Sequence, residues 1–346
     1  MGKQSTPQFS ALNCIDLSNP DINQSVNLLK EACLDSGFFY VVNHGISQEF
    51  MDEVFAQSKK FFSLPHNEKM KTLRNEQHRG YTPVLDELLD PENQEITKRG
   101  IILELKKVKM IHNRRNLFMD RITGPHQMFC PGGGRPWKSS IKRHCMYREV
   151  GKAVAKMIAL ALDLDANYFD RPEILGEPIA ILRLLHYEGQ VSDPSKGLYG
   201  AGAHTDFGLI TLLATDDVPG LQICKDRDAK PQKWEDVAPL KGAFIVNLGD
   251  MLERWSNCVF KSTLHRVLGN GQGRYSDNYW LQPPGLTYVT IAYFLEPSLD
   301  CLVECLPTCK SDSNPPKYPP ILCHDYMTQR YKDTHADLNI YKKQQA

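Results

Sequence analysis

The stretch GAHTDFGLI, residues 202–210, sets the interpretation of the whole 346-residue chain. It places His204 two residues before Asp206, just ahead of an apolar run that predicts a β-strand. Side chains two residues apart on an extended segment point to the same face. An imidazole nitrogen and a carboxylate oxygen could therefore be presented to one metal ion.

A third candidate ligand, His265, stands in the stretch STLHRV, residues 262–267, whose β-branched residues also predict a strand. We refer to His204, Asp206 and His265 as the triad. Two histidines and one carboxylate with open coordination positions are the ligand set of non-haem Fe(II) oxygenases. A zinc protease is the competing interpretation, but it requires a helical His-Glu-x-x-His pattern, and the sequence contains none.

A candidate co-substrate site follows nine residues after His265, in the stretch RYS, residues 274–276. Arg274 offers a planar fork of hydrogen-bond donors and Ser276 adds a hydroxyl. This pair suits a carboxylate group. The triad and the Arg-x-Ser pattern together predict an iron site with a carboxylate-bearing co-substrate beside it.

These residues resemble the Fe(II)- and 2-oxoglutarate-dependent oxygenases of the isopenicillin N synthase-like family, and especially its soluble plant-type members. The similarity covers residues 10–94 and 150–335. Besides the stretches quoted above, the matching strings are GFFYVVNHGI (37–46), GLQI (220–223), IVNLGD (245–250) and WSN (255–257).

The resemblance implies a mainly β protein with flanking helices (α+β), built on a double-stranded β-helix, or jelly-roll, core. Short strand-like runs with Gly and Pro between them agree with an antiparallel arrangement. We expect four parts: an N-terminal helical and strand region (1–94), an atypical basic segment (95–148), the double-stranded β-helix domain (149–335) with an insert (277–290), and a C-terminal tail (336–346).

Among local elements, residues 14–17, 38–42 and 181–187 predict strands, and the strand of His204 is expected to continue through 211–214. Further strands are expected at 221–224, 234–237, 244–248, 262–268 and 290–295. Helices are expected over 22–33, 47–64, 150–162 and 327–341. His44 lies in a predicted turn and is expected to be structural.

By resemblance, the triad holds Fe(II), and 2-oxoglutarate takes two of the remaining positions with its distal carboxylate on Arg274 and Ser276. Tyr187 falls where relatives place a tyrosine near the co-substrate, although Leu185 replaces a frequent asparagine. Molecular oxygen takes the last position, and ascorbate serves as a reductant. The implied reaction oxidises a small organic metabolite with release of succinate and carbon dioxide. Arg183 and His186 are candidate pocket residues, with core or surface roles as the alternative.

Two alternatives stay open from the residues alone. One is an oxidase of the same fold that uses no 2-oxoglutarate, in which Arg274 and Ser276 clamp a substrate carboxylate. The other is a catalytically impaired remnant that still binds metal. Measuring succinate formation distinguishes the first alternative from a 2-oxoglutarate-dependent enzyme.

Composition and charge restrict the kinds of partner that this protein is expected to bind. The formal net charge is zero, so no overall electrostatic attraction to nucleic acid is expected. No apolar run reaches membrane-spanning length, and the first residues lack the apolar core of a signal peptide. The ten cysteines form no framework of close pairs. We expect a cytoplasmic monomer that binds a small-molecule substrate and neither nucleic acid nor membrane.

Residues 95–148 contain 13 Lys and Arg against three Asp and Glu, a net charge of +10. The resembled family places aromatic and small residues here, and codon degeneracy allows another reading frame to encode such residues. We hypothesise that this segment is translated out of frame, and we expect it to pack poorly. The insert 277–290 separates Ser276 from an apolar strand, so it is either a loop or retained non-coding sequence.

Overall fold

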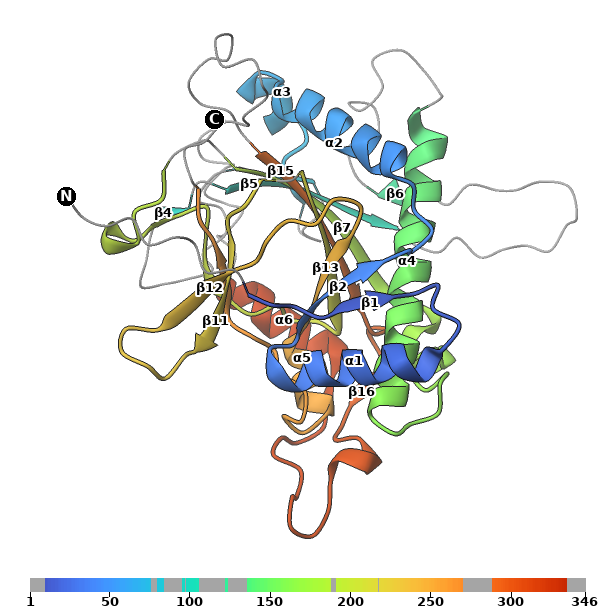
Figure 1. The fold of residues 1–346 in the computed structure, drawn as a ribbon. Coiled ribbons are helices and arrows are strands. Elements are labelled where there is room, and N and C mark those ends of the chain that lie inside the picture. The colour runs from blue at the N-terminus through green and yellow to red at the C-terminus, as the bar shows by residue number, and fades with distance from the viewer. Residues whose placement is uncertain are drawn as a thin grey trace, which may run out of the picture.

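Two β-sheets pack against each other, and helices cover the outer face of the larger one (Figure 1). The computed structural model describes residues 10–75, 80–83, 95–96, 98–105, 122–123, 136–187, 191–216, 218–269 and 288–334. In residues 95–145, and at Tyr288, the description is of the backbone alone.

The major sheet has nine strands in the order β1-β2-β13-β10-β15-β7-β5-β3, with β6 beside β5. All of its strand pairs are antiparallel except β1 with β2. Its strands are β1 (Cys14–Asp16), β2 (Phe38–Val42), β3 (Gly80–Thr82), β5 (Lys98–Leu105), β6 (Ile122–Thr123), β7 (Ile179–Tyr187), β10 (Ile210–Thr215), β13 (Phe244–Leu248) and β15 (Tyr288–Glu296).

The minor sheet has four antiparallel strands in the order β12-β11-β14-β9. They are β9 (Ala201–His204), β11 (Leu221–Asp226), β12 (Lys233–Asp236) and β14 (His265–Val267). Two short pairs complete the described strands: β4 (Glu95–Ile96) with β8 (Leu198–Tyr199), and β16 (Leu302–Val303) with β17 (Ile321–Leu322). The two larger sheets make up the core expected of a double-stranded β-helix.

The helices are α1 (Ile22–Asp35), α2 (Gln48–Phe62), α3 (His66–Met70), α4 (Pro136–Ala161), α5 (Asp250–Trp255) and α6 (Cys323–Thr334). Local sequence explains where α1 and α2 begin: the Asp21 carboxylate accepts from the first backbone N–H groups of α1, and the Ser47 hydroxyl does so for α2. Gly37 follows α1 in the left-handed region, at φ +65°. No helix in the described part of the chain is long and apolar enough to cross a membrane.

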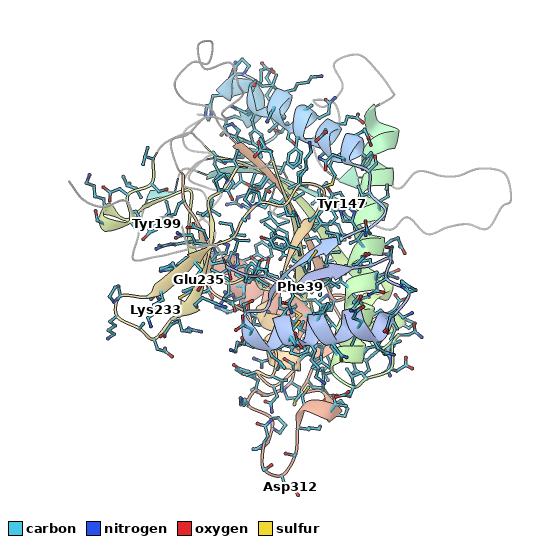
Figure 2. All side chains as sticks on the ribbon, in the orientation of Figure 1. Phe39, Tyr147, Tyr199, Lys233, Glu235 and Asp312 are labelled. Atoms are coloured by element: carbon cyan, nitrogen blue, oxygen red, sulfur yellow. The ribbon has the colours of Figure 1, made fainter. Side chains whose placement is uncertain are left out.

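Alternation along the major strands gives the sheet two different faces. On β10, Leu212 joins the main core beneath the helices, whereas Thr211 and Leu213 line a cavity on the opposite face. Tyr147 of α4 is fully buried, with its ring 5.2 Å from that of Phe244 (Figure 2). The helices thus seal one face of the sheet and leave the other for the cavity.

The expected strands over 38–42, 181–187 and 244–248 are present. The expectation that the His204 strand continues through 211–214 is wrong, because β9 ends at His204 and β10 belongs to the other sheet. The sequence pattern could not show this. The alternation of apolar residues can look the same whether the chain stays in one sheet or passes to the other.

The expectation of poor packing over 95–148 is wrong at Tyr147, which is fully buried, and two parts of the segment form regular backbone structure. Strand β5 pairs with β7 over seven residue pairs, and α4 begins at Pro136 and so precedes the helix expected at 150. The apolar, β-branched run at 101–103 is typical of a strand. The remainder of 95–148 lies outside the described residues, as do 270–287 and the tail from 335. Strand β15 already begins at Tyr288, so the last residues assigned to the insert are strand.

His44 has the structural role expected of it. Its Nε2 lies 3.0 Å from the carbonyl oxygen of Gly242, and its Nδ1 accepts from the Ile46 N–H at 3.2 Å. The imidazole also packs against the ring of Phe244, with ring centroids 4.4 Å apart. Burial lowers the pKa of His44 below its ordinary value, although the hydrogen bond to Gly242 opposes this effect. The neutral ring therefore links the turn after β2 to the start of β13.

Candidate active site

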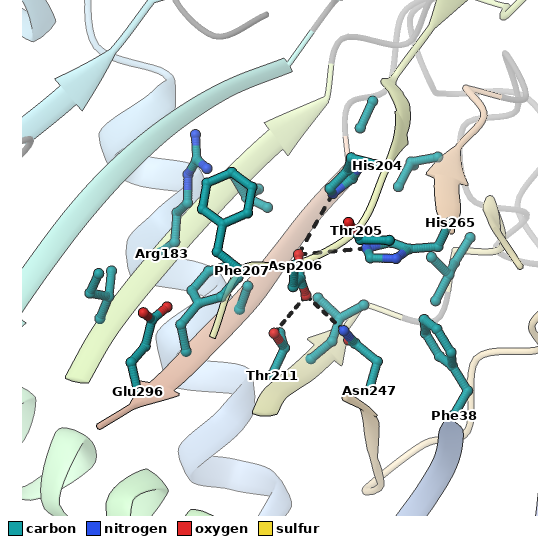
Figure 3. Close-up of a pocket in the computed structure, with 18 of the residues that line it drawn as sticks. Phe38, Arg183, His204, Thr205, Asp206, Phe207, Thr211, Asn247, His265 and Glu296 are labelled. Carbon is teal, nitrogen blue, oxygen red and sulfur yellow. Dashed lines mark hydrogen bonds and ion pairs between the residues drawn. The ribbon is translucent and has the colours of Figure 1, made fainter. Parts of the chain in front are cut away.

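A cavity of about 110 Å³ lies between the two sheets, and the triad lies on its wall (Figure 3). Its other walls are mostly apolar and aromatic. They include Phe38, Ile181, Leu185, Leu213, Val267 and Phe294. The polar side chains that line it besides the triad include Arg183, Thr205, Thr211, Asn247 and Glu296. The chain thus combines a cluster of metal-ligand atoms with an apolar enclosure.

Strand pairing brings the two histidines together. His204 ends β9, His265 begins β14, and the two residues are direct partners across the minor sheet. Their ring centroids are 4.3 Å apart. Asp206 follows β9 by two residues and lies in the crossing to β10, so it reaches the same point from outside the strand. The same-face placement expected for His204 and Asp206 is reached through this turn.

The donor atoms converge on one point. The Nε2 atoms of His204 and His265 lie 3.8 and 3.7 Å from Oδ1 of Asp206. All three ligand atoms lie within 4.8 Å of one another. Two imidazole nitrogens and one carboxylate oxygen suit a divalent transition metal and leave coordination positions for other ligands. The residues present therefore fit the iron that the sequence implies.

Local backbone fixes which nitrogen of each histidine faces that point. Nδ1 of His204 lies 2.8 Å from the carbonyl oxygen of Gly202, and Nδ1 of His265 lies 3.0 Å from that of Thr263. A carbonyl oxygen can only accept, so each Nδ1 carries a hydrogen and each Nε2 keeps its lone pair. Hydrogen bonds of this type orient metal-binding histidines and make them better ligands.

Comparison with known proteins decides the family. The description "non-haem dioxygenase in morphine synthesis N-terminal" matches residues 12–115, and "2OG-Fe(II) oxygenase superfamily" matches 178–283. Kihadalactone A synthase from Citrus sinensis is 46% identical over 332 residues, covering 94% of this chain and 93% of that protein. The chain belongs to the 2-oxoglutarate- and Fe(II)-dependent oxygenases.

Further relatives agree with this assignment. Azadirone synthase from Melia azedarach is 41% identical to this oxygenase, over 94% of this chain and 93% of that protein. The crystal structure of a full-length Neurospora crassa protein in complex with α-ketoglutarate and thymine superposes with a TM-score of 0.73 at 27% identity. The match covers 93% of this chain and 96% of that one. The oxygenase therefore uses Fe(II), 2-oxoglutarate and molecular oxygen, and the expected double-stranded β-helix fold is confirmed.

The predicted co-substrate residues are placed only in part. Tyr187 is the last residue of β7, is 3% exposed and lines the cavity. Leu185, which stands where relatives often have asparagine, lines it too. Arg274 and Ser276 lie outside the described residues.

The two further candidate pocket residues on β7, Arg183 and His186, lie on opposite faces of the sheet. Arg183 lines the cavity, where Figure 3 shows it beside the ring of Phe207. His186 points to the other face of the sheet and stacks on Phe62, with centroids 4.8 Å apart. His186 is therefore a packing residue, as the alternation along a strand requires.

The sequence argument missed two residues that contact the triad. Thr211 and Asn247 both donate hydrogen bonds to Oδ2 of Asp206, at 2.6 and 2.7 Å. Asn247 stands in the IVNLGD string, but nothing in that string reveals its partner. Burial raises the pKa of Asp206, but the His265 and His204 imidazoles and these two hydrogen bonds outweigh it and lower that pKa overall. Asp206 is thus ionised, and its Oδ2 accepts both hydrogen bonds.

Proposed function

We propose that this oxygenase oxidises a largely apolar metabolite, of the kind handled by the kihadalactone A and azadirone synthases, at iron held by His204, Asp206 and His265. The observation that carries the proposal is the convergence of these three donor atoms on the wall of an apolar cavity. The two relatives named above support the choice of substrate class, since both align along more than nine-tenths of the chain.

Different residues of this chain orient the metal ligands and bind the co-substrate. Nδ1–H groups held by backbone carbonyls keep both imidazoles in the orientation that offers Nε2. By the family resemblance, Arg274 would bind the distal carboxylate of 2-oxoglutarate, and Ser276 would add a hydrogen bond. Tyr187 lines the cavity. When bound, the iron and 2-oxoglutarate supply oxygen activation, with succinate and carbon dioxide as co-products.

The cavity walls exclude water and orient the substrate. Its apolar side chains favour a hydrocarbon skeleton. Arg183 is 8% exposed, and we assign it to an oxygen-bearing group of the substrate, because a guanidinium in an apolar wall discriminates strongly between substrates that do and do not accept its hydrogen bonds. Arg183→Met should raise KM for such a substrate and leave KM for 2-oxoglutarate unchanged.

The test is a turnover screen with purified full-length protein, Fe(II), 2-oxoglutarate and ascorbate. Candidate substrates are precursors of kihadalactone A and of azadirone, with thymine and homoarginine as contrasting small polar compounds. We expect substrate-dependent succinate with the first two and none with His265→Ala. Product formation without succinate would instead establish the oxidase alternative, and coupled turnover with thymine or homoarginine alone would refute the apolar substrate class.

The cellular compartment and the oligomeric state form a second part of the proposal. Cys33, Cys224, Cys301, Cys305, Cys309 and Cys323 are buried, and every cysteine whose side chain the structure describes is free of a disulfide. Free thiols are typical of reducing compartments. We propose a cytoplasmic monomer, to be tested by cell fractionation and by light scattering of the purified protein; a stable dimer would refute the monomer.

A further inference from the structure

The two oxygens of the Asp206 carboxylate have different surroundings. Oδ1 faces the Nε2 atoms of His204 and His265 at 3.8 and 3.7 Å. Oδ2 faces away from them and accepts from the Thr211 hydroxyl at 2.6 Å and from the Asn247 amide at 2.7 Å (Figure 3). Each carboxylate oxygen offers about two lone-pair sites. The two donors therefore fill the hydrogen-bonding capacity of Oδ2.

These two donors come from a different sheet from the imidazoles. Thr211 on β10 and Asn247 on β13 are direct partners in the register of the major sheet, whereas both histidines belong to the minor sheet. Their side chains are buried, as is Asp206. A buried donor that loses its acceptor costs about 1–3 kcal/mol. Either side chain thus resists rotation of the Asp206 carboxylate, and together they fix it against the major sheet.

The geometry points to a positioning role for this pair: Thr211 and Asn247 hold Asp206 as a one-oxygen metal ligand. A carboxylate with both oxygens free can bind a metal through both and occupy two positions. With Oδ2 engaged by two donors, Asp206 offers Oδ1 alone, and the position that a second oxygen would take stays open for co-substrate or oxygen. The inference rests on the assignment of the triad to iron and adds to it the residues that aim one ligand.

The experiment uses Co(II) alone as the probe, titrated calorimetrically into the metal-free full-length protein. Thr211→Val and Asn247→Ala each remove one donor to Oδ2. We expect each to weaken Co(II) binding by about 10–100-fold, the range typical of lost outer hydrogen bonds at metal sites. Thr211→Ser keeps the hydroxyl and should restore most of the affinity. Thr215→Val, the same change further along β10, should leave Co(II) affinity unchanged.

The visible spectrum of bound Co(II) supplies a second measurement, because it responds to the number and arrangement of ligands. It should change in Thr211→Val and Asn247→Ala, and in neither control. If Asn247→Ala does not fold, Thr211→Val against Thr211→Ser decides the matter. Absence of Co(II) binding by the unaltered protein would overturn the metal assignment itself. Binding by the unaltered protein with equal affinity and spectrum in Thr211→Val would overturn only the positioning role.

Discussion

Adding one methyl group at Gly249 should disturb the metal site without touching any ligand. A Cβ built on Gly249 would lie 2.8 Å from the carbonyl carbon of Gly208, and closer still to its oxygen. Both neighbours are backbone atoms, so neither can rotate away. Gly208 lies two residues after Asp206, and the Asp250 N–H donates to the Asp206 carbonyl at 2.8 Å. The methyl group therefore pushes against the segment that carries the carboxylate ligand.

The size of the effect follows from this contact. Real Cβ atoms essentially never approach other heavy atoms closer than 3.0 Å, so the two backbones must separate by roughly half an ångström or more. Overpacking of this kind typically costs about 1–3 kcal/mol of stability. A displacement of about 1 Å in a positioned group can cost on the order of 100-fold in rate. We expect Gly249→Ala to lose about 10–100-fold in kcat/KM.

Three measurements test this expectation: the unfolding midpoint in urea, the Co(II) dissociation constant, and kcat/KM for succinate release. Gly176→Ala is the matched control, because its added Cβ would meet nothing closer than 3.5 Å. We expect that control to behave like the unaltered protein in all three. A Gly249→Ala protein with unchanged stability and unchanged Co(II) affinity would show that this crossing does not set the position of Asp206.

Three further outcomes are expected. Arg274→Lys should weaken 2-oxoglutarate binding by about ten- to a hundred-fold, because a point charge replaces a planar fork and one charge-assisted bond worth about 1.5–3 kcal/mol is lost; an unchanged dependence on 2-oxoglutarate would transfer Arg274 to the substrate. The lowered pKa of His44 means that the unfolded chain binds this proton more readily, so the free energy of unfolding should be greatest above pH 6.5 and fall as the pH drops through 6.5 towards the folded pKa. That slope should be reduced in His44→Gln, and denaturation curves showing equal slopes would contradict it. Sequencing the transcript over 95–148 should reveal a reading frame different from the one that encodes these residues. A transcript that encodes the given residues in frame would refute the hypothesis.

Local sequence determined much of the framework. The Asp21 and Ser47 caps, the apolar faces of α1 and α2 and the apolar run of β2 all act within a few residues, so their elements could be predicted from the sequence. The triad was also accessible, because the chemistry of iron restricts its ligands to a few residue types at recognisable spacing. The packing role of His44 followed from its place in a turn.

Tertiary structure alone decided how the site is assembled. Strands β9 and β10 are nearly continuous in sequence yet lie in different sheets, and only their pairing with β14 and β13 shows it. For the same reason Thr211 and Asn247 could not be found from the sequence: they are far apart along the chain, and their meeting at Asp206 depends on strand register. Strand β5 shows the same limit, since its pairing partner β7 lies far along the chain. Residue type fixed what the site can bind, and long-range strand pairing fixed how each ligand is held.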